Sequence, residues 1–433
     1  MAGPRTSDYV IPRHRLASKE RHCIFTSGIC GDSIVTPKPV FVGRPPLIRQ
    51  TNAEILLRLL RESGPCSKAD LVRASGLSAP SVTNVVASLT SIGLVETVGA
   101  GDSTGGRPPD ILRFKADHGC VAGVEITRKE LRFLLADLNG IELAHSEARI
   151  ERSKSKPRQI CRHIAHELWR LLRKTRLSRN QLLSVTVGVP AIVNVDEGMV
   201  LAFTPLRDWN RVSLGPMLAS ELKCHVLVDN DTNLAAQGEF YCGAARGESD
   251  FVFITIAEGV GAGIFLNGRV YRGAQWSAGE IGYLRVPDIS REHPAIHKLG
   301  KLETALSAPS ILENWRASAH KSSVPSRVRV ADVWDLAASG NVKAKRILRQ
   351  RATILADVIL DLALILNPNL ILLGGEVGNH PALLREVNGL LEGSEFAVSK
   401  VTLGALGLRA VLSGAVSIAV QPTLLRLLQR SHG

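Results

Sequence analysis

The stretch ITIAEGVGAGIFLNGRVYRGAQWSAGEIGY, residues 254 to 283, indicates the fold of this 433-residue chain. An apolar strand over residues 251–257 runs into glycines at positions 259, 261 and 263, and a second apolar strand follows. Asn267-Gly268 then marks a tight hairpin turn. Closely spaced glycines let a backbone turn sharply and approach a ligand with its amide groups. Because the stretch closes on the carboxylate of Glu280, it indicates a ligand-binding loop; the alternative is an ordinary hairpin with a glycine bulge.

The segments on either side favour the ligand-binding interpretation. The sequence VDNDTN occupies residues 228–233, LETALS occupies 302–307 and ILLGGE occupies 371–376. In this order the motifs resemble the ROK family, which contains bacterial sugar kinases and sugar-responsive transcription regulators. The resemblance covers residues 119–433. It implies that they form an α/β duplicated domain of the actin and sugar-kinase type, which we expect to sense sugar and to mediate oligomerisation.

Composition limits the class of protein. The chain is 45% hydrophobic, which is enough for full globular cores, and its formal net charge is +13. No apolar run is long enough and uncharged enough to predict a membrane span, and no apolar segment follows the N-terminal arginines as in a secretory signal. Seven scattered cysteines without a Cys-x-x-Cys pair predict a reducing compartment. We therefore expect a cytoplasmic protein without a membrane partner.

The first 118 residues predict a disordered basic arm over 1–46 and a winged helix-turn-helix over 47–118, an α+β unit. Asn52 is a candidate cap for the first helix, Ser67 and Asp70 form a candidate capping box for the second, and Ser78 caps a third helix over residues 79–89. Strands over 94–98 and 111–114 flank a Gly- and Pro-rich loop. The alternative is a small helical bundle whose loop only links domains. The order of these segments resembles the DNA-binding domain of ROK regulators, which the kinases lack.

The third helix supplies the predicted contacts to DNA bases. Its inward face is apolar, whereas its outward face carries short, uncharged polar side chains that suit a major groove. In the wing loop, an arginine between Gly-Gly and Pro-Pro can enter a minor groove. The predicted DNA-binding residues are Ser81, Thr83, Asn84, Ser88 and Arg107.

The first hairpin turn of the large domain argues against kinase activity. In the kinases of the family this turn reads Asp-x-Gly-Gly-Thr and holds ATP phosphates, whereas here the matching residues are Glu125 to Lys129 (EITRK). Both glycines are absent, so a tight phosphate-binding turn is not expected. The interpretation is a domain without catalytic residues or cofactor, in which Asp231 occupies the position of the family's general base.

The same resemblance places a sugar-binding site at Asn210, Asn230, Asp231, Glu280, Tyr283 and Glu303. Amides beside carboxylates suit hydrogen bonding to vicinal hydroxyls. The alternative for residues 230–232 is the N-cap of the helix that follows.

Two further segments bear on partners. The family usually has histidine at position 283 and a cysteine-rich zinc loop after it, but here Tyr283 is followed by no cysteine, and His293 and His297 alone do not predict zinc. No metal is expected. Residues 149–179 contain eleven Lys and Arg against two Asp and Glu. This stretch is either a solvated helix face or an additional patch for DNA or another partner.

Together these features predict a sequence-specific transcription regulator of carbohydrate genes, a repressor in the usual family mode. Its partners would be an operator duplex, a sugar or sugar derivative and a second copy of itself, in a homodimer or homotetramer. The alternatives are an active ROK sugar kinase that carries a DNA-binding module, and a scaffold protein with a vestigial sugar site.

Overall fold

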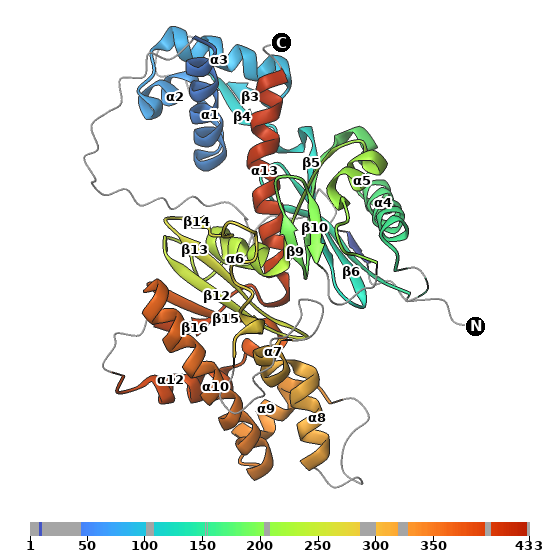
Figure 1. Ribbon diagram of the computed structural model, residues 1–433. Helices are drawn as coiled ribbons and strands as arrows, with labels where there is room; N and C mark the ends of the chain where they lie inside the picture. Colours follow the sequence, from blue (N-terminus) through green and yellow to red (C-terminus); the bar gives the residue numbers. More distant parts are fainter. Residues whose placement is uncertain are drawn as a thin grey trace.

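The computed structural model describes residues 8–10, 45–100, 108–151, 153, 155–202, 208–285, 300–318, 328–394 and 400–430. Arg107, His293 and His297 lie outside these ranges. The described residues form a small N-terminal domain and two lobes of a larger one, with a long C-terminal helix that runs from between the lobes, along the first lobe, into the N-terminal domain (Figure 1).

The N-terminal domain is a winged helix-turn-helix. It contains α1 (Pro45–Ser63), β2 (Cys66–Ser67), α2 (Lys68–Ser75), α3 (Ala79–Ile92), β3 (Val95–Ala100) and β4 (Asp110–Phe114), with the strands in the order β2-β4-β3. Ser67 and Asp70 cap α2 reciprocally, and Ser78 accepts a hydrogen bond from the amide of Ser81 at the start of α3. These two predicted caps are confirmed, and they fix where α2 and α3 begin.

One local prediction in this region was wrong, and two short strands were not expected. Helix α1 begins at Pro45, so Asn52 lies inside it and does not cap it. Strand β2 was not expected, because two residues carry no periodic signal. The arm is not wholly unstructured, since β1 (Asp8–Val10) pairs antiparallel with β7 at the edge of the first lobe.

The first lobe is a six-stranded sheet covered on both faces. Its strands are β1, β5 (Cys120–Ile126), β6 (Glu130–Asp137), β7 (Glu142–Arg149), β8 (Leu182–Val189) and β11 (His225–Asn230), in the order β1-β7-β6-β5-β8-β11. Helices α4 (Pro157–Lys174) and α5 (Leu214–Leu222) pack on one face. The outward side of α4 is basic and exposed, with Arg158, Arg162 and Arg173 among its residues. Strands β9 (Ile192–Asn194) and β10 (Met199–Ala202) form a separate pair.

The second lobe repeats this topology. Strands β12 (Phe251–Ile256), β13 (Val260–Leu266), β14 (Arg269–Val270), β15 (Leu370–Gly374) and β16 (Lys400–Leu403) lie in the order β14-β13-β12-β15-β16. In each lobe three antiparallel strands are followed by two that pair in parallel. The repeat confirms the duplicated α/β fold. At the hairpin turn, Asn267 and Gly268 both have positive φ, as their sequence predicts.

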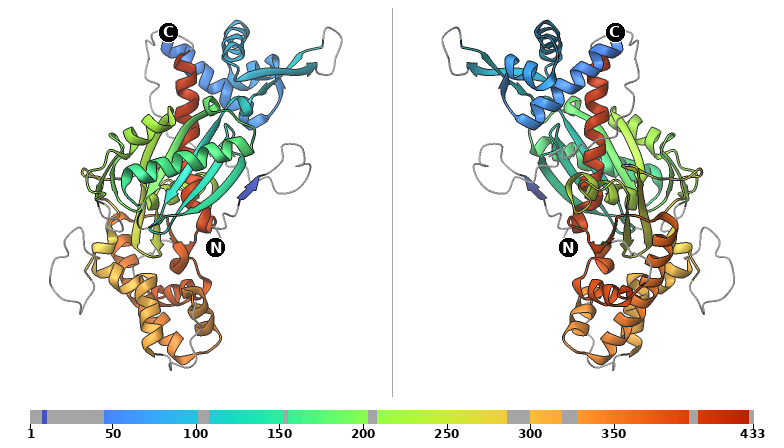
Figure 2. Two further views of the ribbon diagram at one scale, coloured as in Figure 1. Left: turned by 90° about the vertical axis from the view of Figure 1, so that its right-hand side faces the viewer. Right: turned by 90° about the vertical axis from the view of Figure 1, so that its left-hand side faces the viewer.

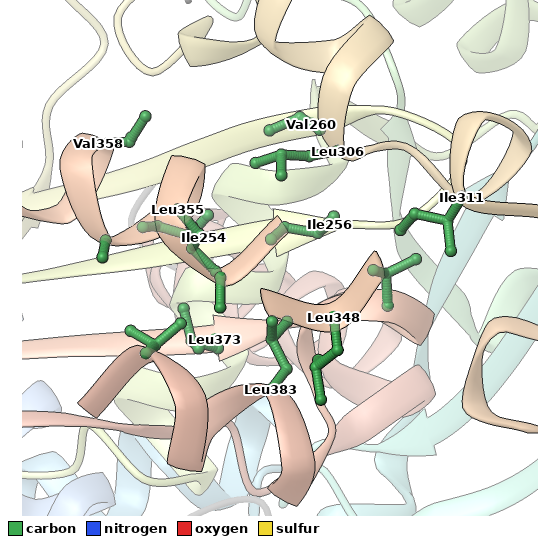
Figure 3. Packing of buried hydrophobic residues seen from close by; sticks show 14 of the residues in the cluster. Ile254, Ile256, Val260, Leu306, Ile311, Leu348, Leu355, Val358, Leu373 and Leu383 are labelled. Atoms are coloured by element: carbon green, nitrogen blue, oxygen red, sulfur yellow. The ribbon is translucent and has the colours of Figure 1, made fainter. Parts of the chain in front are cut away.

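The core of the second lobe lies between its sheet and a helical layer. That layer contains α7 (Lys301–Leu306), α8 (Ala308–Ser318), α9 (Val330–Ala338), α10 (Val342–Leu366) and α12 (Pro381–Leu391), and the short α11 (Gly375–Gly378) follows β15. Figure 3 shows Ile254 and Ile256 of β12 and Leu373 of β15 packed against Leu355 of α10 and Leu383 of α12.

Two helices join the lobes. Helix α6 (Asp231–Cys242) packs on the second sheet, and α13 (Ala410–Arg430) packs on the first sheet and along α6. Their backbones touch at two glycines. A Cβ on Gly414 would lie 1.8 Å from the carbonyl oxygen of Leu234, and one on Gly238 would lie 2.3 Å from that of Ala410. Only glycine therefore permits this packing, so α6 and α13 form one rigid pair.

The far end of α13 belongs to the DNA-binding domain. Leu424 and Leu428 are buried in a cluster that also contains Leu56 and Leu60 of α1, and Arg61 of α1 donates to Asn139 of the β6–β7 turn at 3.3 Å. Both side views show α13 extending from the lobes into the small domain (Figure 2). The predicted boundary at residue 118 therefore does not separate two independent cores.

Residues Gly407–Gln429 are long and apolar enough to cross a membrane, contrary to the sequence expectation that no such run exists. Of the most apolar part, 61% is buried inside the protein. Because this segment packs along α6 and the first sheet, we interpret it as a core helix.

Candidate functional site

The outward face of α3 presents the short polar side chains that the sequence predicted for DNA. Val82, Val85, Val86 and Leu89 are buried beneath it. Thr83 and Asn84 are exposed, whereas Ser81 and Ser88 are half-buried. Ser81 also shares a hydrogen bond with Ser78, 2.9 Å between the hydroxyl oxygens. Thr83 and Asn84 are therefore the two side chains freest to reach base edges, and their role stays a prediction.

The wing beside α3 carries its own charge. Arg113 of β4 forms an ion pair with Glu96 of β3, and Lys115 lies 3.5 Å from the same carboxylate. Both cations are exposed enough to contact phosphates as well.

A second group of polar side chains converges between the lobes, at the N-terminus of α6. Asp231 is the first residue of this helix, and its carboxylate accepts a hydrogen bond from the amide of Thr232 at 2.7 Å. Burial raises the pKa of Asp231 to about 6, and the neighbouring Asp229 adds to the rise. Asp229 is itself paired with Arg272 from the second lobe, which ties the two lobes together at this point.

Glu280 and Glu303 lie beside Asp231. Burial raises the pKa of Glu280 to about 7, and the charges of Asp231 and Glu303 raise it further. The pKa of Glu303 is also raised by burial, while the amide of Gly300, at 3.3 Å, and the charge of Arg128 oppose that rise. Asp231 and Glu303 thus both act on the charge of Glu280, so these three predicted sugar-binding residues lie in one region, and their role in binding stays a prediction.

Glu125, at the end of β5, is a fourth member of the cluster. Burial raises its pKa to about 7, Arg132 opposes the rise, and Asp231 adds to it. Arg132 lies 3.3 Å from the Glu125 carboxylate and also pairs with Glu130. Sequence reasoning had treated Glu125 only as part of a lost phosphate turn, so its place in the cluster was missed.

The remaining predicted sugar-binding residues are placed differently. Asn230 is the N-cap of α6: its carbonyl oxygen accepts from the amide of Asn233 at 3.0 Å, and its side-chain nitrogen donates to the carbonyl of Ala191 at 3.1 Å. The capping alternative therefore holds for Asn230, and the ligand-binding role of Asp231 stays a prediction. Tyr283 is half-buried at the end of a short 3-10 turn that follows Glu280, and Asn210 is exposed after the buried Trp209.

The glycines of the opening stretch are used for packing. A Cβ on Gly261 would lie 3.1 Å from the Thr232 hydroxyl, and one on Gly263 would lie 2.5 Å from the Cβ of Ala236. A Cβ on Gly259 would lie 2.8 Å from a carboxylate oxygen of Glu303. The strand β13 thus lies directly on α6 and beside Glu303, which brings the carboxylates together. The sequence predicted a ligand-binding loop here, and the resemblance implies that in the family's kinases the matching loop is the second turn that holds phosphates.

The turn opposite that loop is cationic. Lys129, between β5 and β6, pairs with Glu258, between β12 and β13, and the Nε of Arg128 lies 3.8 Å from the same carboxylate. This ion pair joins the two turns that hold phosphates in the kinases of the family. Sequence reasoning missed Glu258. The opposite charges of Glu258 in one turn and of Arg128 and Lys129 in the other could have indicated this ion pair.

Metal binding has little support among the described residues. They contain no group of three or more His, Cys, Asp and Glu side chains that could hold a metal ion.

Comparison with known proteins relates both parts of the chain to regulators. The ROK family model matches residues 121–421, and the IclR helix-turn-helix domain model matches residues 53–99. The xylose repressor of Bacillus spizizenii is 24% identical over 342 residues, which are 78% of this chain and 86% of that protein. The DNA-binding transcriptional dual regulator NagC of Escherichia coli (strain K12) is 27% identical over 344 residues, 78% of this chain and 83% of NagC.

Solved structures extend the likeness to the fold. A ROK family transcriptional regulator, a homolog of the Escherichia coli MLC protein, superposes with a TM-score of 0.71 at 24% identity, covering 89% of this chain and 98% of that one. A ROK family glucokinase from Streptomyces griseus, in complex with glucose and AMPPNP, gives a TM-score of 0.58 at 23% identity and covers 70% of this chain and all of its own.

Proposed function

The chain belongs to the ROK family, and from this premise we propose that it is a DNA-binding transcriptional repressor of carbohydrate genes that a sugar releases from its operator. The winged helix-turn-helix reads the operator through α3, with Thr83 and Asn84 at base edges. The sugar binds between the lobes at Asp231, Glu280 and Glu303. The protein acts in the cytoplasm as a dimer or tetramer, so that two reading helices engage two half-sites.

One observation carries the proposal: a single helix, α13, packs against both α6, which begins at Asp231, and α1 of the DNA-binding domain. A ligand that contacts Asp231 therefore acts on a helix pair whose far end is buried in the other domain. Such a connection couples two sites when it differs between two states of the protein. Repressors named for xylose and N-acetylglucosamine among the relatives support the class of ligand and the sign of regulation.

Kinase activity is the alternative, and the geometry of the two turns opposes it. Phosphoryl transfer requires backbone amides and metal to hold a triphosphate in line with the acceptor. Here the first turn has lost its glycines, its cations are engaged by Glu258, and Gly259 lies against the Glu303 carboxylate. Asp231 matches the position of the family's general base, but of the two phosphate turns only the glycine loop at Gly259 to Gly263 survives.

The test combines selection, calorimetry and a kinase assay on the purified full chain. An operator is first selected from random duplexes, and its release is then followed while D-xylose, D-glucose and N-acetyl-D-glucosamine are added. We expect one sugar to bind and to release the operator, and Asp231→Ala to abolish both effects. Sugar-dependent consumption of ATP that disappears in Asp231→Asn would instead establish the kinase.

A further inference from the structure

The charges that surround the proposed sugar site select the class of sugar. Four carboxylates converge there: Glu125, Asp231, Glu280 and Glu303. Each of these side chains is at least partly buried. Burial raises the pKa of Glu125, Asp231 and Glu280, and a neighbouring acid raises each pKa further. An additional anion in this cluster would meet like charges in a medium that screens them poorly.

The cations that reach these carboxylates are already engaged. Arg132 is shared among Glu125, Glu130 and Glu147. Arg128, whose charge acts on Glu303, lies against Glu258 together with Lys129. Glu258 thus occupies, from the opposite lobe, the two cations that a phosphate group would need.

We infer that the site takes an unphosphorylated, neutral sugar and excludes its phosphate ester, and that Glu258 is the residue that determines this specificity by neutralising Arg128 and Lys129. This inference rests on the proposed sugar-sensing function. A phosphomonoester carries nearly two negative charges at neutral pH. A neutral sugar brings only hydroxyls, for which ionised carboxylates are good acceptors.

The inference has a direct test in full-length protein at pH 8, where the carboxylates are ionised. Calorimetry would compare D-glucose with glucose 6-phosphate, and N-acetyl-D-glucosamine with its 6-phosphate. In the unmodified protein we expect the neutral member of the binding pair to bind at least about tenfold more tightly than its phosphate, as expected for one uncompensated like charge.

Glu258→Gln should reduce this difference in affinity between the neutral sugar and its phosphate, because the substitution frees Arg128 and Lys129 while retaining the shape of the side chain. We expect affinity for the phosphate to rise at least about fivefold, with affinity for the neutral sugar changed by less than about twofold. Glu386→Gln is the matched control. Glu386 is a similarly exposed carboxylate in an ion pair with Arg349, 3.0 Å away between α10 and α12. Glu386→Gln should leave the ratio of the affinity for the neutral sugar to the affinity for its phosphate unchanged.

Two results would overturn the inference while leaving sugar sensing intact: tighter binding of a phosphate than of its parent sugar in the unmodified protein, or an equal ratio in Glu258→Gln and Glu386→Gln. If neither member of either pair bound, and xylose also failed to bind, the proposed function itself would fall, and this inference with it.

Discussion

Truncation of Leu424 tests whether α13 connects the sugar site to the DNA-binding domain. Leu424 is 4% exposed and lies in the cluster shared with α1, beside a groove of about 230 Å³ that Leu57, Arg58 and Leu425 also line. Leu424→Ala removes three buried carbon groups, a transfer cost of about 2.5 kcal/mol. Because the new void adjoins an existing groove, the added cavity cost should be small.

That loss is comparable with the free energy available for coupling. Coupling between two sites on a protein is typically about 1–3 kcal/mol. A weakening of this size at the α13–α1 contact should therefore uncouple the domains without abolishing either binding activity, since Leu424 lies neither on α3 nor among the carboxylates. We expect Leu424→Ala to bind sugar and operator separately, and to require at least about tenfold more sugar for half-release of the operator.

Calorimetry measures sugar affinity, fluorescence anisotropy measures operator binding, and titration of sugar into the complex measures coupling. Leu391→Ala is the control, because Leu391 is also buried but lies on α12 in the second lobe. Half-release at the ordinary sugar concentration in Leu424→Ala would refute the role of α13. An equal loss of coupling in Leu391→Ala would show that general destabilisation causes the effect.

The remaining predictions concern the reading helix, the buried carboxylates and metal content. Thr83→Ala with Asn84→Ala should abolish the preference for the operator over random duplex in anisotropy, while most of the salt-dependent affinity remains; equal operator binding by a fragment that begins at Gly119 would contradict this. The raised pKa of Glu280, about 7, means that the folded state keeps a proton that the unfolded state releases between pH 4.5 and 7, so this group destabilises the fold as pH rises. Glu280→Gln should therefore raise the free energy of unfolding at pH 8 by about 3 kcal/mol, with the gain shrinking toward pH 5, and a gain independent of pH would exclude this cause. Elemental analysis of dialysed protein should find no stoichiometric zinc, and about one zinc per chain would overturn that expectation.

Local signals in the sequence predicted local structure well. The Ser67–Asp70 capping box, the Ser78 cap and the Asn267-Gly268 turn each depend on residues within four positions of one another, and each is present as expected. Residue types at such positions determine backbone conformation directly, so no knowledge of the rest of the fold is needed.

Contacts between distant segments were not predictable in the same way. No local pattern indicated that Leu424 and Leu428 complete the core of the first domain, because an apolar helix face does not specify its partner. Gly259, Gly261 and Gly263 illustrate the same limit. Their spacing predicted that the backbone approaches a ligand closely. The backbone does make close approaches, but its neighbours in the structure are α6 and Glu303.

The position of Asp231 shows how a kinase-like cleft can become a sensor with few changes. Its helix, α6, begins at an asparagine cap and packs by glycine contacts against α13. The carboxylate at the family's general-base position therefore lies on the helix that packs against α13, and α13 reaches the DNA-binding domain. A sensor needs only this contact and a bistable connection, whereas a kinase also needs both phosphate turns. In this chain Arg128 and Lys129, paired with Glu258 of the other lobe, stand in one of those phosphate turns. This change removes the phosphate-binding turn that a kinase needs and leaves the contact of a sugar with Asp231 possible.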